Sequence, residues 1–339
     1  MSTSYRNINP ITLAYAQPVT ALSFDPVSDI LWAGSNLGDV TGYHGTRGIS
    51  GVSFKVGGNL AVKKIVAGES HVRALGISGE GFGTWAKGGM NKWYFRHASN
   101  ITSFSNTANS SIVAASTAEM DLVYINSLTG VALRQIATPS IISHLQASAT
   151  VLLSGSSDGY LRTHDPRSNS SRSAENQVKA HTGGIQGLDT TGNFVFTIGL
   201  GERKSRPFPD PLVKIYDLRT MRSLPPIAFS SGPAFIHVLP KRASTIMIVS
   251  NQGLVNTVDV LNPAAASEFY QLDLASYVTS CSVSATAAYL AFGDADGAIH
   301  ILSQAEDIAG VPFNGFDGQP IDWADAPAEL TEIDWTDST

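Results

Sequence analysis

The side chains that could catalyse a reaction are scattered along this 339-residue sequence. Its eight histidines form no HExxH-type pair and no cluster with the single cysteine, Cys281, so a zinc site has no support. The serine-rich stretches lack the Gly-x-Ser-x-Gly turn of serine hydrolases. Asp294 and Asp296 could form a carboxylate pair, but they flank a predicted hairpin turn, where aspartates commonly accept hydrogen bonds from backbone amides. We therefore expect no catalytic, cofactor-binding or metal-binding residues.

Basic residues are the second group with a chemical role to consider. Arg203, Lys204 and Arg206 lie in residues 199–211, which contain two glycines and three prolines and are expected to project as a loop. Arg219 and Arg222 follow the next strand. Four more bases are candidates for the same side of the molecule: Arg167, Arg172, Lys241 and Arg242. Together these side chains could bind RNA phosphates or a partner, and the alternative is that they are ordinary solvated charges.

The third group is a set of aromatic residues in an acidic segment. Residues 305–339 contain nine acids and no base, and the aromatic residues in question are Phe313, Phe316, Trp323 and Trp335. Isolated aromatic side chains cannot build a core, but they can fill pockets on a partner. Two alternatives remain open: the segment docks on a partner, or part of it packs on the rim of the protein's own fold.

The composition favours a chain of many short strands. Hydrophobic residues make up 43% of the sequence and charged residues only 15%, which suits strands and turns better than amphipathic helices. A single cysteine cannot form an internal disulfide, so a reducing compartment is expected. The N-terminus has no pattern of a secretory signal, and the longest uncharged run, 274–293, alternates as strands do. We expect no membrane segment.

Alternating strands and glycine-containing turns recur seven times. The third strand of each repeat is predicted to end near residues 43, 95, 125, 164, 216, 258 and 302. The mean spacing, near 43, matches the period of about 40–45 residues of propeller blades. In the second repeat the three strands are predicted at 72–77, 82–85 and up to Phe95. The run Ile11–Tyr15, within residues 1–18, is a candidate strand for closing the last blade.

Two stretches resemble the WD-repeat family. Ser154–Asp165 reads as strand, Asp-Gly turn and strand, and Leu212–Thr220 contains an aromatic-Asp pair, Tyr216-Asp217. The hydrogen-bond tetrad typical of these repeats is nowhere complete: repeat five offers His181, Thr197 and Tyr216, but its aspartate is displaced by the 199–211 insertion. The resemblance implies an all-β, seven-bladed WD-repeat β-propeller over residues 1–304, with a short acidic extension, 305–339.

A second resemblance extends over most of the chain and is close from about residue 181 to residue 263. The 199–227 region, Gly232-Pro233-Ala234-Phe235, Val258–Pro263 and Ile333–Asp337 resemble catalytic subunits of the poly(A)-nuclease deadenylation complex. This family combines an N-terminal propeller, a linker, an inert ubiquitin-hydrolase-like domain and an Asp-Glu-Asp-Asp exonuclease. The last two domains have no counterpart in this sequence, so no nuclease carboxylate and no divalent metal can be carried over.

The resemblance implies a non-catalytic role in shortening mRNA poly(A) tails in the cytoplasm. The expected partners are the adaptor pseudokinase subunit and tails coated with poly(A)-binding protein, with weak direct contact to RNA as a further possibility. The alternative is a generic WD-repeat scaffold that binds peptides in another complex.

Overall fold

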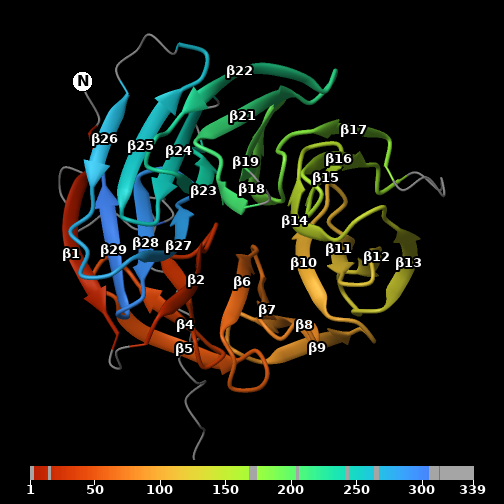
Figure 1. The fold of residues 1–339 in the computed structure, drawn as a ribbon. Helices are drawn as coiled ribbons and strands as arrows, with labels where there is room; N and C mark the ends of the chain where they lie inside the picture. The colour runs from red at the N-terminus through yellow and green to blue at the C-terminus, as the bar shows by residue number, and fades with distance from the viewer. Residues whose placement is uncertain are drawn as a thin grey trace, which may run out of the picture.

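Every regular element in the described part of this computed structural model is a β-strand. The structure describes residues 4–13, 17–167, 174–203, 206–240, 244–262, 267–304 and Phe313. Its 29 strands form seven sheets arranged around a central axis (Figure 1). The predicted all-β, seven-bladed WD-repeat propeller is confirmed.

The strands of each blade lie side by side, with the first strand next to the central axis and the last at the rim. Blade 1 contains β2 (Val19–Phe24), β3 (Ile30–Ser35), β4 (Asp39–His44) and β5 (Ile49–Lys55). Blade 2 contains β6 (Val62–Ala67), β7 (His71–Gly76), β8 (Gly81–Ala86) and β9 (Asn91–Arg96). Blade 3 contains β10 (Ile101–Asn106), β11 (Ile112–Thr117), β12 (Asp121–Asn126) and β13 (Ala132–Ala137). Blade 4 contains β14 (Ile142–Ala147), β15 (Leu152–Ser156), β16 (Tyr160–His164) and β17 (Asn176–Lys179).

The last three blades include one extra strand and one strand from the N-terminus. Blade 5 contains β18 (Ile185–Thr191), β19 (Phe194–Arg203), β20 (Arg206–Pro209), β21 (Leu212–Asp217) and β22 (Arg222–Ala228). Blade 6 contains β23 (Pro233–Val238), β24 (Thr245–Ser250), β25 (Leu254–Asp259) and β26 (Glu268–Gln271). Blade 7 contains β27 (Val278–Val283), β28 (Tyr289–Asp294), β29 (Ala298–Ser303) and β1 (Arg6–Thr12), which pairs antiparallel with β29. The closing strand therefore begins earlier than the predicted run at Ile11.

The second repeat differs from its prediction by one strand. The three predicted strands are β7, β8 and β9, whereas the innermost strand is β6. Two adjacent lysines, Lys63 and Lys64, interrupt the alternation of β6 and hid it from the sequence pattern. With β8 as the third strand, the third strands of the first three blades end at residues 44, 86 and 126, so their spacing is regular.

The inner strands share one irregularity. In all seven blades the pairing of the first and second strands shifts register just after the first residue, as between Ile142 and His144. Such a bulge re-aims one side chain. The hydroxyl of Ser143, at this position, donates to the Ile185 carbonyl of the next blade at 2.7 Å, and Thr102 donates likewise to Ile142 at 2.7 Å. The bulges thus connect neighbouring blades around the axis.

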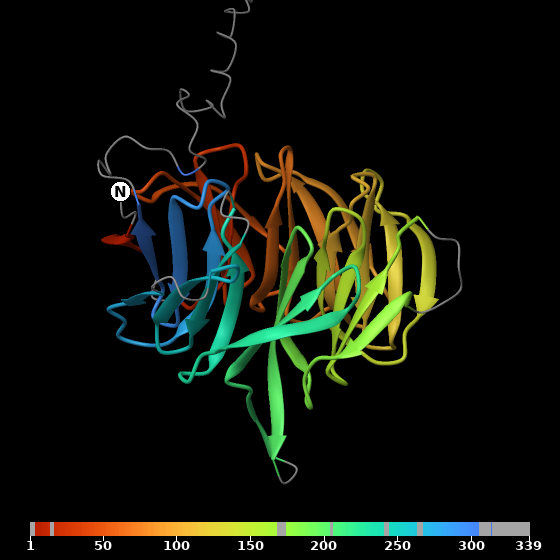
Figure 2. The same cartoon turned by 90° about the horizontal axis from the view of Figure 1, so that it is seen from above.

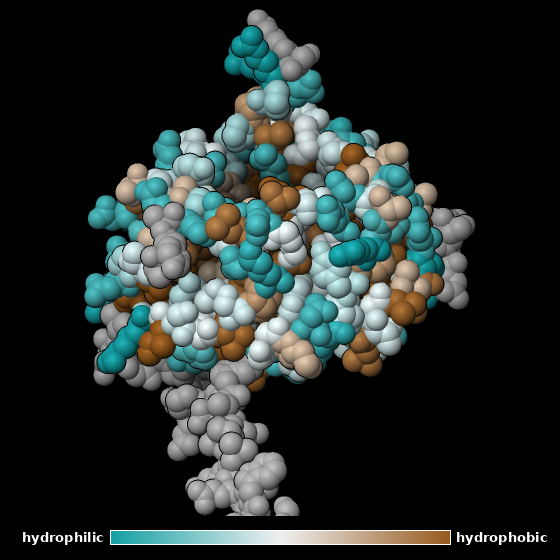
Figure 3. All heavy atoms as spheres, turned by 90° about the horizontal axis from the view of Figure 1, so that it is seen from below, coloured by the Kyte–Doolittle hydropathy of each residue, from teal (hydrophilic) through white to brown (hydrophobic). Residues whose placement is uncertain are grey.

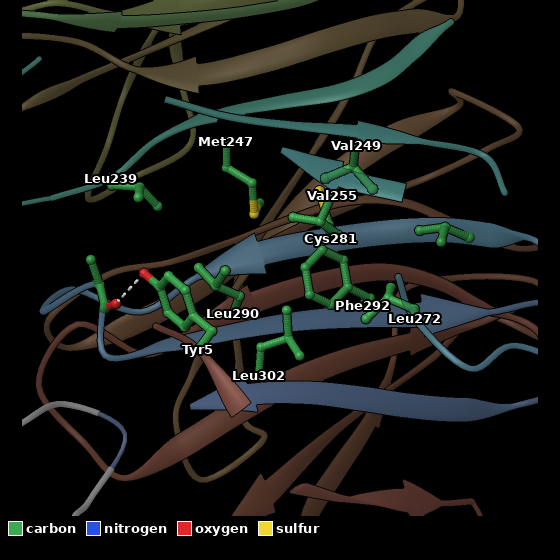
Figure 4. Close-up of a cluster of buried hydrophobic side chains, with 12 residues drawn as sticks. Tyr5, Leu239, Met247, Val249, Val255, Leu272, Cys281, Leu290, Phe292 and Leu302 are labelled. Atoms are coloured by element: carbon green, nitrogen blue, oxygen red, sulfur yellow. Dashed lines mark hydrogen bonds between the residues drawn. The ribbon is translucent and has the colours of Figure 1, made fainter. Parts of the chain in front are cut away.

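The hydrophobic core is divided among the seams, the interfaces between neighbouring blades. Seven clusters of buried side chains each join two adjacent blades. Figure 4 shows the cluster between blades 6 and 7, where the Tyr5 hydroxyl donates to the Ala287 carbonyl at 2.7 Å. Burial of this kind is the main stabilising contribution, and it fixes the orientation of every blade relative to its neighbours.

The disc has two distinct faces. One face carries the turns between second and third strands and the loops between blades, and the β19–β20 hairpin projects from it (Figure 2). We call it the hairpin face. The opposite face carries the turns between first and second strands and between third and fourth strands.

Candidate interaction surfaces

The hairpin carries the exposed bases predicted in the 199–211 insertion. The insertion does project, but as two paired strands instead of an irregular loop: β19 continues past the blade and pairs with β20. Arg203 and Arg206 face each other in this pairing at the tip, and both are exposed. Lys204 lies outside the described residues. The hairpin tip is therefore a positively charged point above the hairpin face.

The base of the hairpin is held by the loop that precedes blade 5. Gly183 donates its N–H to the Leu200 carbonyl at 2.8 Å, and Leu200 donates to the Gly184 carbonyl at 2.9 Å. The Phe208 ring lies against Gly201, where a Cβ atom would come within 2.5 Å of the ring. Pro207 and Pro209 lack N–H groups, which protects β20 from pairing with a further strand. The hairpin is thus a stiff projection, unsuited to strand addition along β20.

The insertion also completes a hydrogen-bond network that the sequence pattern missed. Asp210, at the end of the hairpin, accepts from His181 Nδ1 at 3.0 Å, and His181 Nε2 lies 3.1 Å from the Thr197 hydroxyl. Burial is the largest effect on the His181 side chain and lowers its pKa. The hydrogen bond from His181 and the nearby Lys214 lower the pKa of Asp210 against the opposing effect of burial. Asp210 therefore takes the position next to His181 that the sequence pattern assigns to the missing aspartate of repeat five. Its position depends on the pairing of β19 with β20, which residue spacing does not predict.

The predicted convergence of the bases is wrong for Arg219 and Arg222. Phe194 pairs with Asp217, so the turn after β21 lies at the opposite end of β19 from Arg203. Ten residues of β19 span about 30 Å at the usual rise of a strand. Arg219 also pairs with Asp217 at 3.1 Å. Arg167 lies on the opposite face as well, in the turn after β16, while Arg172, Lys241 and Arg242 lie outside the described residues.

The structure places one of the four predicted tail aromatic residues. Phe313 is fully buried at the seam between blades 7 and 1, with ring centroids 5.2 Å from both Phe24 and Tyr289. Its backbone N–H donates to Asp29 Oδ1 at 2.7 Å on the opposite face. This side chain packs on the protein's own fold and is not accessible to a partner. Phe316, Trp323 and Trp335 lie outside the described residues.

The central channel contains a cavity of about 280 Å³ with several partly buried polar groups. Lys64 donates to the carbonyls of Phe104 and Leu145 at 2.8 and 3.2 Å, and burial lowers its pKa to about 8. Asp189, next to the lining residue Leu188, accepts from the Val238 N–H at 2.8 Å and from Nε2 of the lining residue Gln146 at 3.2 Å, and burial raises its pKa. Burial, together with the nearby charge of Lys64, lowers the pKa of His144 to about 4. Because each of these groups already interacts with other groups of the protein, we interpret them as structural parts of the channel wall.

The described residues contain no arrangement typical of a metal site or a membrane span. No three His, Cys, Asp or Glu side chains among them come together as metal ligands would. No helix in the described ranges has the length and apolar character needed to cross a bilayer. Cys281 is buried, and burial raises the pKa of its thiol. The hairpin and the seams therefore remain the candidate sites of interaction.

Comparison with known proteins identifies relatives over almost the whole chain. Residues 1–303 match the family model described as PAN2 N-terminal. The catalytic subunit PAN2 of the PAN2-PAN3 deadenylation complex of Cryptococcus neoformans is 33% identical over 98% of this chain and 31% of its own length. The corresponding subunit of Schizosaccharomyces pombe is 29% identical over 85% of this chain and 26% of its own length. The chain thus spans less than a third of these relatives.

A solved structure has the same architecture. The Pan2 WD40 domain of Neurospora crassa superposes with a TM-score of 0.81, covering 91% of this chain and 97% of that domain, at 21% sequence identity. At this identity the likeness supports the fold alone.

Proposed function

Because this chain belongs to the PAN2 N-terminal family, we propose that it is the non-catalytic recruitment platform of a cytoplasmic poly(A)-specific deadenylase. Its relatives are named as catalytic subunits of a deadenylation complex, and it corresponds to their N-terminal WD propeller. The 3′-to-5′ exoribonuclease activity and its divalent metal belong, in this proposal, to a downstream domain. The propeller itself positions the substrate and takes no part in the chemical step.

The observation that carries the proposal is the arrangement of the two faces. The stiff hairpin presents Arg203 and Arg206 on one face, and Phe313 fixes the start of the acidic segment on the other. In this proposal, a poly(A) ribonucleoprotein bound at the hairpin face is tethered, through the propeller and the acidic segment, to the downstream nuclease domain. Tethering raises the local concentration of substrate at a distant active site without any new contact there.

The proposed partners are poly(A) coated with its binding protein, at the hairpin face, and the adaptor pseudokinase subunit, through the acidic segment. Direct contact of the hairpin with RNA phosphates is the weaker part of the proposal, since only two described bases lie at the tip. Each phosphate contact adds to the salt dependence of binding, which makes this part measurable.

The test is a pull-down and salt titration of residues 1–339 against bare poly(A), coated poly(A) and the adaptor. We expect coated poly(A) and the adaptor to bind. Arg203→Glu/Arg206→Glu should weaken binding to coated poly(A), and Arg219→Glu/Arg222→Glu, on the opposite face, is the matched control. Binding to bare poly(A) with a steep salt slope would make RNA the direct ligand of the hairpin. No binding to any of the three ligands would contradict the recruitment proposal and favour a generic peptide-binding scaffold.

A further inference from the structure

The acidic segment contains one short motif twice. Ile321-Asp322-Trp323-Ala324-Asp325 and Ile333-Asp334-Trp335-Thr336-Asp337 share the pattern Ile-Asp-Trp-x-Asp, twelve positions apart. Each copy offers two bulky apolar side chains next to two carboxylates. A segment of this kind cannot form a core of its own, but it can dock in a cleft whose apolar and charged groups match it.

A cleft of about 380 Å³ lies at the seam between blades 1 and 2. One wall is the end of β5 and the loop to β6, from Lys55 to Leu60. The other wall comes from blade 2: Ser78, Glu80, Trp85, Asn91, Tyr94 and Arg96. The volume lies at the lower end of the range of about 300–1,000 Å³ for ligand pockets, which suits one large side chain and its neighbours.

Two glycines keep the first wall open. Gly57 and Gly58 both have positive φ, 137° and 61°. A Cβ atom at Gly58 would meet nothing within 4 Å, and one at Gly57 would lie 3.3 Å from the Tyr94 hydroxyl. The space beside Tyr94 is therefore bounded by backbone, and an incoming ring has room there.

An apolar lip borders the cleft on the hairpin face. Leu37, Leu60 and Ile77 are 40%, 52% and 61% exposed. They come from three loops held side by side, since Val56 donates to the Gly38 carbonyl at 2.9 Å and Ile77 to the Ala61 carbonyl at 2.8 Å. Figure 3 views this part of the rim, where apolar residues stand among hydrophilic ones below the hairpin. Single exposed apolar residues are ordinary, whereas a group of them beside a cleft indicates a docking surface.

A basic lip borders the other side. Lys55 and Arg96 are exposed, and neither forms a salt bridge with a carboxylate in the described part of the chain. The Arg96 guanidinium lies 5.5 Å from the centre of the Tyr94 ring. Glu80 is the one acid in the lining, so the cleft has a net positive charge. It complements a segment that carries two carboxylates per motif.

The acidic segment is long enough to reach this cleft. Phe313 is fixed at the seam between blades 7 and 1, so the cleft is one blade away. Trp323 follows Phe313 by ten positions and Trp335 by twenty-two. At about 3.3 Å per extended residue these separations allow about 33 Å and 73 Å. A six-residue strand is about 20 Å long and the four strands of a blade are together about 14 Å wide. The separation to Trp335 therefore spans the path around blade 1 with chain to spare, and the separation to Trp323 just matches it.

We propose that the cleft between blades 1 and 2 binds the Ile-Asp-Trp-x-Asp motif of the same chain, with the tryptophan beside Tyr94, the isoleucine on the apolar lip and the carboxylates toward Lys55 and Arg96. One cleft serves two copies, so one copy remains available while the other is bound. This intrachain site does not depend on the recruitment role proposed above.

The experiment uses the 339-residue chain with Trp323→Ala/Trp335→Ala, which leaves the cleft without its own ligand. A fluorescein-labelled peptide of residues 319–327 is titrated with this variant, and its anisotropy is measured. We expect binding that is at least about tenfold tighter than to the unmodified chain, whose own motif competes. The same peptide with alanine in place of its tryptophan should not bind.

Two further substitutions, each added to the double variant, locate the site. Leu60→Asp and Arg96→Glu should each weaken peptide binding about tenfold, because they remove an apolar contact and a charge-assisted hydrogen bond. Ile141→Asp, at an exposed apolar position on the hairpin face between blades 3 and 4, and Arg219→Glu, on the opposite face, should leave binding unchanged. Unfolding midpoints of all variants show whether each remains folded.

Three results would overturn the proposal. The first is no binding of the peptide to the double variant. The second is binding that Leu60→Asp and Arg96→Glu leave unchanged, which would place the peptide elsewhere. The third is competition by the unmodified chain only at concentrations where it dimerises in light scattering, because the motif would then dock on a second copy.

Discussion

The Nδ1 atom of His181 lies 3.0 Å from Oδ2 of Asp210, although 29 positions separate the two residues in the sequence. Asp210→Ala should lower the free energy of unfolding by about 1–3 kcal/mol, since it leaves a buried imidazole N–H without its acceptor. Urea denaturation measures this change. Asp217→Ala removes a solvent-exposed pair with the Arg219 side chain and one hydrogen bond from the Arg219 backbone N–H, and it should lower the free energy of unfolding much less. Equal effects of the two substitutions would contradict the structural importance of the His181–Asp210 contact.

Phe313→Ala should destabilise the seam between blades 7 and 1. The side chain is fully buried between Phe24 and Tyr289, and removing a buried phenylalanine costs about 3–5 kcal/mol in well-packed cores. Hydrogen exchange should show loss of protection first in β1 and β2, which border this seam. Phe208→Ala, at a partly exposed ring on the hairpin, is the control and should change the unfolding midpoint little. Unchanged exchange in β1 would mean that Phe313 does not support ring closure.

The buried ion pair between Lys87 and Asp25 joins blades 1 and 2. Lys87 Nζ lies 2.7 Å from Asp25 Oδ1, and both side chains are buried. Lys87→Met should cost about 3–5 kcal/mol, because the Asp25 carboxylate then lacks its cation. Lys87→Met/Asp25→Asn should cost less than the sum of the two single changes. A double-mutant cycle by chemical denaturation measures the coupling, and additive effects would show that the two charges do not stabilise each other.

Stability should fall as the pH decreases below about 6.5, and His144 should contribute to this loss. The pKa of His144 is about 4 in the folded chain, against an ordinary value of 6.5. The unfolded chain therefore takes up its proton first, and protons favour unfolding between these two values. Because His144 lines the channel, solvent partly screens its charge. We therefore expect protonation of His144 to lower the free energy of unfolding by about 1–2 kcal/mol at pH 5. His144→Gln should reduce this part of the pH dependence in urea titrations at pH 7.5 and pH 5. Identical pH profiles would contradict the burial of a neutral imidazole.

The architecture was predictable because each blade repeats one pattern of apolar residues and turns. The Asp-Gly turns at Asp158 and Asp296 and the Tyr216-Asp217 pair marked the blades locally. The inner strand of blade 2 escaped prediction because Lys64 donates to carbonyls inside the channel, so its polar side chain occupies an inward position that the alternation assigns to an apolar residue.

The candidate surfaces were harder to predict than the blades. Arg203 and Arg219 lie on opposite faces because the hairpin precedes β21 and Arg219 follows it, so the two bases adjoin opposite ends of one strand. The order of insertion, strand and bases in the sequence already contained this information, and the predicted convergence overlooked it. Phe313 resembled the other aromatic residues of the acidic segment, and only its packing between Phe24 and Tyr289 distinguishes it. The cleft at Tyr94 requires loops from two blades to come together, which local patterns do not express.

The closure of blade 7 by β1 has a consequence for biosynthesis. Thr12 is translated nearly three hundred residues before its partner Ala298. At about 5–20 residues per second, the edge of β1 waits unpaired for roughly 15–60 s on the ribosome. An open strand edge pairs readily with other chains, so a chaperone that covers residues 6–12 during this interval should raise the yield of closed rings.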